Sequence, residues 1–180
     1  MDIHSDFSLP WCKTLLTSSA IQITEIPTKA AKTPQDKSLS NSMFLRTLYT
    51  PHGIRAQINF KRPTTEPDAI ISYEYCYLIS LGDGLDGLTG RAHGGLNALI
   101  LDHMTGSMSS QAMGSFAPAT ATMTIDYKAP IDTPGVVLCR GWVVEMSGRK
   151  TWARAVLEDG TGKVLASAKA LFISPRTQKV

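Results

Sequence analysis

The chain has 180 residues, which is enough for one domain with a substantial core and too few for two. Its net charge of +3 is too small to predict a nucleic-acid-binding protein, and no segment approaches the ~18 apolar residues of a membrane span. The N-terminus lacks a secretory pattern, and Cys12, Cys76 and Cys139 lie far apart, so we expect a cytoplasmic protein with reduced thiols.

Residues 1–68 are predicted to form an irregular N-terminal extension that packs on the rest of the domain. Prolines interrupt this part repeatedly, and a polar, lysine-rich stretch from Thr28 to Ser42 is expected to be mobile. Elsewhere in residues 1–68, the segment from Ile54 to Lys61 is compatible with either a short strand or a helix.

From residue 69 to residue 175 the pattern predicts one folded unit, followed by a tail at 176–180. The pattern predicts a strand from Ile70 to Leu81 that ends in a glycine-rich loop, residues 82–90. Four further strands are expected after the helix described below: Ala119–Tyr127, Val136–Met146, Thr151–Glu158 and Val164–Ile173. Short turns join the last three, which indicates an antiparallel meander. The predicted fold is α+β, with a curled sheet of about five to six strands around one long helix.

The start of that helix is the most informative stretch of the sequence. Gly94 and Gly95 follow His93 and precede an apolar run, and inside a helix each glycine would cost about 1 kcal/mol. At a helix start they leave unpaired N–H groups open to a close-lying molecule. Such a turn, close to the positive end of the helix dipole, favours a negatively charged oxygen.

Helical periodicity also places a carboxylate on a face made of small residues. One face is apolar: Leu96, Leu99, Ile100, Met104 and Met108. The other contains Gly95, Ala98, Asp102, Thr105, Gly106 and Ser109. Asp102 is therefore either an ordinary surface carboxylate or a reactive group that faces a substrate or a partner. We expect Met104, Met108 and Met113 to fill the core rather than to line an acyl pocket, although methionine suits both.

Three motifs occur in order: Ala92-His93-Gly94-Gly95 with Asp102 on the helix that follows, the strand Thr120–Ile131, and Ser147-Gly148-Arg149-Lys150. Together they resemble the hotdog-fold acyl-CoA thioesterases, in the branch with a His-Gly-Gly signature. The resemblance covers roughly residues 70–175. Upstream, Phe44–Leu48 with Thr50-Pro51 is similar to the extension of fungal members.

The resemblance implies an enzyme that hydrolyses an acyl-CoA or acyl-carrier thioester to an acid and a thiol, with no metal or redox cofactor. In the family a helix carboxylate acts on the thioester carbonyl, directly or through a water, and a glycine N–H binds the oxyanion. These roles fall on Asp102 and Gly95, with His93 and Gly94 shaping the turn around the substrate and Thr120 assisting. A thiolate leaves readily, and one oxyanion donor can contribute about 3–4 kcal/mol.

Each of these residues also has a plainer interpretation. His93 could only cap the helix, and Thr120 is one of several threonines that alternate along a strand. Arg149 and Lys150 could form an ordinary charged turn, or they could bind the phosphates of coenzyme A.

Other function classes stay open at this point. Release of an acyl chain from a biosynthetic carrier protein, by hydrolysis or cyclisation, uses the same chemistry, and a non-catalytic acyl-binding protein is a further alternative. A hydratase is disfavoured because Asp102 and His103 are adjacent. The small-residue face and the expected sheet edges predict a homodimer or homotetramer with the active site at a subunit boundary.

Overall fold

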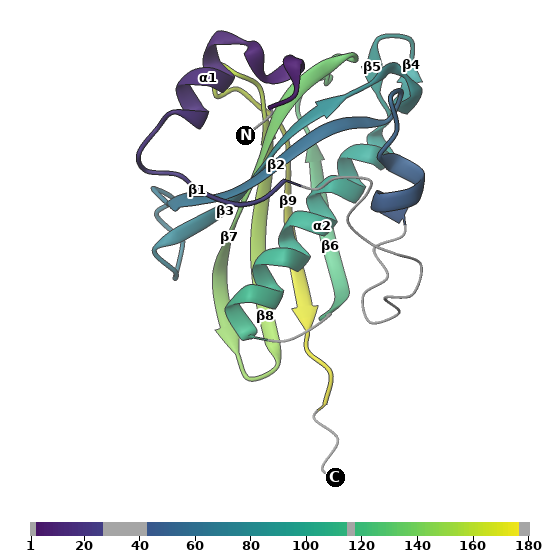
Figure 1. The fold of residues 1–180 in the computed structure, drawn as a ribbon. Coiled ribbons are helices and arrows are strands. Elements are labelled where there is room, and N and C mark those ends of the chain that lie inside the picture. Colours follow the sequence, from purple (N-terminus) through teal and green to yellow (C-terminus); the bar gives the residue numbers. More distant parts are fainter. Residues whose placement is uncertain (1–2, 27–42, 115–117, 177–180) are drawn as a thin grey trace.

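A seven-stranded antiparallel sheet wraps around one long helix in the computed structural model, which describes residues 3–26, 43–114 and 118–176 (Figure 1). The strand order is β1-β2-β3-β7-β8-β9-β6. The bounds are β1 Gln22–Glu25, β2 Ile54–Pro63, β3 Tyr73–Leu81, β6 Ala119–Tyr127, β7 Gly135–Ser147, β8 Lys150–Glu158 and β9 Val164–Ile173. A small separate pair, β4 (Asp86–Leu88) and β5 (Arg91–Ala92), precedes the helix α2 (Gly94–Met113).

The strands predicted after residue 69 form, and β7, β8 and β9 make the expected meander. The sheet is larger than predicted because strands from the first 68 residues join it. Ile54–Pro63 is the ten-residue strand β2, which pairs with β3 so that Ile58 lies opposite Leu78. The sheet therefore begins well before residue 69, inside the stretch expected to be irregular. Thr28–Ser42 and most of the tail at 176–180 lie outside the described residues.

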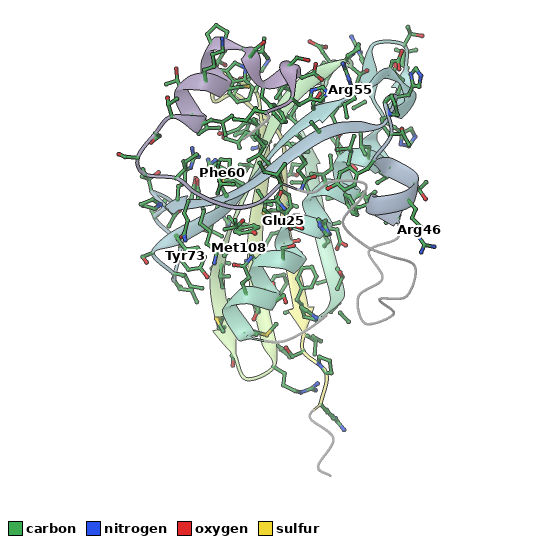
Figure 2. All side chains as sticks on the ribbon, viewed as in Figure 1. Glu25, Arg46, Arg55, Phe60, Tyr73 and Met108 are labelled. Carbon is green, nitrogen blue, oxygen red and sulfur yellow. The ribbon has the colours of Figure 1, made fainter. Side chains whose placement is uncertain are left out.

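Helix α2 begins at the predicted pair of glycines. It ends at Met113, and the next residue, Gly114, has a φ of 57°, a left-handed conformation that glycine adopts without a steric penalty. The predicted apolar face is confirmed, because Ile100, Met104 and Met108 are almost fully buried in the core between α2 and the sheet. Met108 is labelled in Figure 2.

The small-residue face of α2 is partly covered by its own chain. Thr105 and Ser109 are fully buried, and a Cβ on Gly106 would lie 3.1 Å from the Phe172 ring of β9. These small residues therefore allow the helix to approach the sheet closely. The exposed Gly95 and the half-buried Ala98, Asp102 and Gly106 of this face remain accessible.

The outer face of the sheet carries a second apolar cluster under the short helix α1 (Pro10–Leu16). Phe60, Cys76 and Leu78 are its buried centre. Trp11 of α1 lies so close to Gly160 that a Cβ there would be 2.4 Å from the indole ring. The N-terminal segment is thus an integral layer of the fold, and all three cysteines are buried and unpaired.

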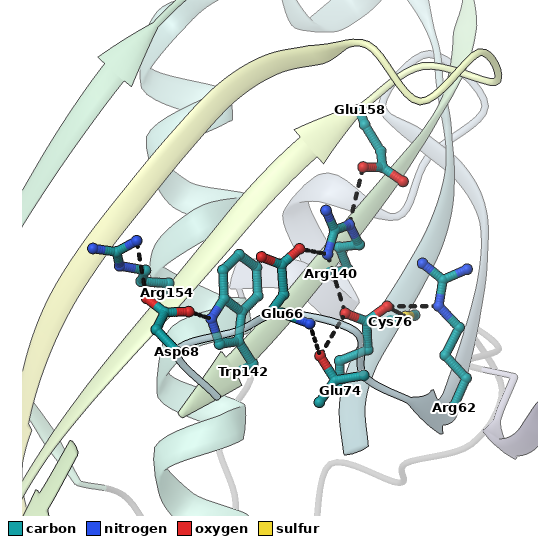
Figure 3. Close-up of polar contacts among 10 residues, drawn as sticks. Arg62, Glu66, Asp68, Glu74, Cys76, Arg140, Trp142, Arg154 and Glu158 are labelled. Carbon is teal, nitrogen blue, oxygen red and sulfur yellow. Dashed lines mark hydrogen bonds and ion pairs between the residues drawn. The ribbon is translucent and has the colours of Figure 1, made fainter. Parts of the chain in front are cut away.

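A network of ion pairs crosses the outer face beside that cluster (Figure 3). Arg140 bonds to three carboxylates, those of Glu66, Glu74 (3.1 Å) and Glu158 (3.0 Å). Arg62 donates to the other oxygen of Glu74 at 2.6 Å. Glu74 is only 2% exposed, and a buried negative charge is costly unless it is paired. The two arginines therefore stabilise the ionised form of Glu74. The network joins β2, β3, β7 and β8 with the connection that follows β2.

Among the described residues, no helix is both long enough and apolar enough to cross a membrane.

Candidate active site at the start of helix α2

His93 caps α2. Its Nδ1 accepts a hydrogen bond of 2.8 Å from the Gly95 N–H, while its carbonyl oxygen accepts from the N–H groups of Leu96 and Asn97. The first four N–H groups of a helix, from the N-cap residue onward, have no partner one turn back; here the Leu85 carbonyl accepts from that of His93, and the N–H groups of Gly95 and Leu96 bond to His93. Within the described ranges, no acceptor bonds to the N–H of Gly94. The open donor is therefore that of Gly94, whereas the Gly95 N–H, predicted as the oxyanion donor, is already occupied.

The loop before the helix is tied to the segment that follows β6. The two carboxylate oxygens of Asp86 accept from the Gly90 N–H at 2.8 Å and from the Thr133 hydroxyl. The His93 N–H donates to the Leu85 carbonyl at 2.8 Å. The glycine turn therefore rests on a fixed loop. Sequence reasoning missed Asp86, because nothing in its local pattern points to a partner 47 residues away.

Asp102 lies two turns further along α2, on the side of the edge strand β6. Its Oδ1 accepts a 2.9 Å hydrogen bond from the Thr120 hydroxyl. Asp102 is half-buried and Thr120 is exposed, so the carboxylate can be reached from outside. The structure thus brings two predicted site residues together although 18 positions separate them.

β6 also contacts the first turn of the helix. Tyr127, at the end of this strand, donates from its hydroxyl to the Gly94 carbonyl oxygen at 3.1 Å. Sequence reasoning placed Tyr127 on the strand and gave it no function. The only signal for it is an aromatic side chain at the end of the strand.

The adjacent His103 belongs to the interior rather than to this site. Its ring stacks on Phe44 at 4.3 Å and lies 5.7 Å from the Tyr77 ring. Burial lowers the pKa of His103, although the nearby Asp102 carboxylate opposes the shift. Asp102 and His103 therefore point to different surroundings and do not form an acid–base pair.

Arg149 and Lys150 lie far from the glycine turn of the same chain. They are exposed in the β7–β8 turn, where Arg149 donates to the Ser174 carbonyl at 2.8 Å. The Ser174 hydroxyl in turn contacts the sulfur of Met113 at the other end of α2. A helix of 20 residues is about 30 Å long. Within one chain, the structure does not bring these cations together with His93, Gly94 and Gly95.

Comparisons with known proteins find similarity to thioesterases. The family model described as the thioesterase superfamily matches residues 89–166. Acyl-coenzyme A thioesterase THEM4 of Xenopus laevis is 31% identical over 115 residues, which are 57% of this chain and 51% of that protein. The Mus musculus THEM4 is 33% identical over 96 residues, covering 53% of this chain and 40% of its own length. The chain thus spans about half the length of these curated relatives, or less.

Solved structures confirm the fold class. Thioesterase superfamily member 2 from zebra fish superposes with a TM-score of 0.53 at 14% identity, covering 64% of this chain and 81% of its own. A thioesterase superfamily protein from Shewanella loihica gives 0.51 at 20% identity, covering 57% and 84%. The predicted hotdog fold, with an antiparallel sheet around one main helix, is therefore correct.

Proposed function

We propose that the protein hydrolyses an acyl-CoA thioester to a free acid and a thiol, and the match of residues 89–166 to the thioesterase superfamily model supports this proposal. The observation that carries the proposal is the pairing of Asp102 with the Thr120 hydroxyl on the accessible side of α2. The open N–H of Gly94 supplies the second element that this chemistry needs, a donor for the developing oxyanion.

The reaction follows from these groups. Asp102 attacks the thioester carbonyl carbon, or accepts a proton from the water that does so, and the Thr120 hydroxyl orients the carboxylate. The carbonyl oxygen becomes negatively charged and accepts a hydrogen bond from the Gly94 N–H. The C–S bond then breaks, and the thiolate leaves and takes up a proton. When water attacks, this step releases the free acid; when Asp102 attacks, the acyl group stays on its carboxylate as an anhydride, which a water then hydrolyses to the free acid and the regenerated carboxylate.

The two groups act on one carbonyl only if they come from two chains. Gly94 and Asp102 are separated by eight residues, or about 12 Å along the axis of α2. An oxyanion donor must lie within about 3 Å of the oxygen, and an attacking atom within about 3.5 Å of the carbon. β6 is an edge strand whose residues are mostly exposed. Two copies paired antiparallel through β6 would place the start of one helix beside the middle of the other.

Replacing Asp102 tests the proposed chemistry. Asp102→Asn keeps the size of the side chain and removes its ability to attack or to accept a proton. We expect kcat on the best acyl-CoA substrate to fall at least ~10²-fold, with an unchanged Tm. Activity within a few-fold of the parent would remove Asp102 from the mechanism and would overturn the proposal.

Gly94 can be tested with a matched pair of variants. Proline is tolerated at the first helical position, and His93 already has the extended conformation (φ −61°, ψ 138°) that precedes proline. Gly94→Pro therefore removes the N–H and little else. Gly94→Ala keeps the N–H and adds a methyl group at an ordinary distance of 3.5 Å from the Tyr127 ring. We expect a loss of roughly 10²–10³-fold in kcat for proline and a small one for alanine.

Mixing the two inactive variants tests whether the site is shared. A heterodimer of Asp102→Asn and Gly94→Pro chains has one intact site and one that lacks both groups. After random exchange of subunits, about a quarter of the parental activity should return. If each chain holds a complete site, mixing restores nothing.

A further inference from the structure

Gly94 is held by a side chain that lies outside the helix. Tyr127 reaches it from the end of β6: the hydroxyl donates to the Gly94 carbonyl oxygen at 3.1 Å, and the ring edge lies 3.5 Å from where a Cβ would stand. The residue is nevertheless 57% exposed, so burial of the ring is not what keeps it in this position. Its one polar group is directed at the helix instead of at water.

The carbonyl that Tyr127 contacts belongs to the peptide unit that joins the two glycines. The other end of that unit, the Gly95 N–H, is bonded to Nδ1 of His93 at 2.8 Å. A carbonyl oxygen has two lone pairs, so it can accept from Tyr127 in addition to the N–H four residues later in the helix. Tyr127 and His93 thus hold one peptide unit from opposite ends.

These two hydrogen bonds restrict a part of the backbone that would otherwise move easily. Two adjacent glycines have no Cβ atoms to restrict their backbone, and the first turn of a helix frays easily. An oxyanion donor is effective only when it is held in place before the reaction, within about 0.5 Å of the productive position. The Gly94 N–H belongs to the preceding peptide unit, so its direction relative to the Gly94 carbonyl stays fixed only while the two backbone dihedral angles of Gly94 do not change.

We propose that Tyr127 is a positioning residue that fixes the Gly94 carbonyl and thereby orients the open N–H of the same glycine toward the substrate. The inference rests on the proposed function, because it assigns the donor role to Gly94. It adds a residue outside the helix and its preceding loop, and it gives β6 a second role in the site beside that of Thr120.

Tyr127→Phe is the direct test, because it keeps the ring and removes the hydroxyl. We expect kcat to fall roughly fivefold to twentyfold, with KM nearly unchanged and Tm within about 1 °C of the parent, since the lost bond is solvent-exposed. Tyr75→Phe is the matched control. It removes a tyrosine hydroxyl that bonds to Thr24 at 2.7 Å, and it should leave kcat unchanged.

A double-variant cycle separates positioning from other roles. In a Gly94→Pro background there is no N–H left to orient, so Tyr127→Phe should cause no further loss of kcat. A loss of the same size in both backgrounds would show that Tyr127 acts by another route and would overturn the proposal. Activity within twofold of the parent for Tyr127→Phe alone would overturn it as well.

An NMR measurement distinguishes this proposal from the thioesterase proposal. Tyr127→Phe should shift the amide resonances of Gly94 and Gly95 and speed the hydrogen exchange of Gly95, whatever reaction the protein catalyses. Unchanged resonances and exchange would exclude the positioning role. An inactive parent with altered glycine resonances in the variant would instead refute the thioesterase activity and keep the structural link.

Discussion

At the β1–β2 edge of the sheet, polar side chains inside the molecule bond to one another, whereas at the β6 edge they face outward. On the first side, Tyr49 donates to Gln57 at 2.9 Å, Gln57 to Asn59 at 2.6 Å and Asn59 to Glu25 at 3.3 Å. On the second, Asp102, bonded to Thr120, is accessible and the Gly94 N–H is open.

The difference shows that one set of polar groups stabilises the fold and another set is left available for a reaction. Buried polar groups stabilise a protein only when they are fully paired, which is the case along β2 and in the ion-pair network around Arg140. A reactive group must instead keep part of its bonding capacity for the substrate. Changes in the paired groups along β2 or around Arg140 should therefore alter the stability of the fold, and changes at the β6 edge should alter kcat.

The largest effect is expected from breaking the ion-pair network around Arg140. Arg140→Met leaves Glu66, Glu74 and Glu158 without their shared cation, which should cost about 3–5 kcal/mol and lower Tm by about 10 °C. Arg154→Met is the control, because the Arg154–Asp68 pair is partly exposed and should contribute at most about 1 kcal/mol. Thermal unfolding measures both. A loss of kcat in folded Arg140→Met protein with an unchanged Tm would invert the comparison.

A smaller effect, on kcat alone, is expected from changing Thr120 at the β6 edge. Thr120→Val removes the hydroxyl that donates to Asp102 and keeps the branched shape that suits a strand. We expect roughly a tenfold loss of kcat with little change in Tm. Thr120→Ser retains the hydroxyl and should keep most of the activity. Equal losses in the two variants would mean that the methyl group, rather than the hydrogen bond, matters.

The charged turn between β7 and β8 should affect binding rather than catalysis. If Arg149 and Lys150 bind the phosphates of coenzyme A, changing both to alanine should raise KM for acyl-CoA roughly threefold to tenfold and leave kcat unchanged. The effect should disappear with an acyl-N-acetylcysteamine, which carries no phosphate. Losses of the same size on both substrates would show that the bond from Arg149 to Ser174 matters for the fold instead.

The smallest effect is a pH dependence of stability at His103. Burial holds its folded-state pKa below the ordinary value of 6.5, so below that pH the unfolded chain binds a proton that the folded chain does not. Stability should therefore fall as the pH drops from 6.5 through the folded-state pKa, and this contribution should be absent at pH 8. His103→Phe keeps a ring against Phe44 and should flatten Tm between about pH 6.5 and pH 5. Identical pH profiles would exclude His103 as the cause.

The sequence by itself determined those features that depend on neighbours along the chain. The bounds of α2, β6 and β9 follow from periodicity and from glycines at turns, because these signals act over a few residues. The same local reasoning selected the His93-Gly94-Gly95 turn, and helical spacing singled out Asp102.

Tertiary structure alone decided which residues meet across the chain. β2 is a strand because β3 pairs with it, and its own residues were equally compatible with a helix. Whether Gly94 or Gly95 keeps an open N–H depends on the direction of the His93 ring, and the contact of Tyr127 with Gly94 joins residues 33 positions apart. Such contacts arise from the packing of whole elements against one another, and no short stretch of sequence encodes them.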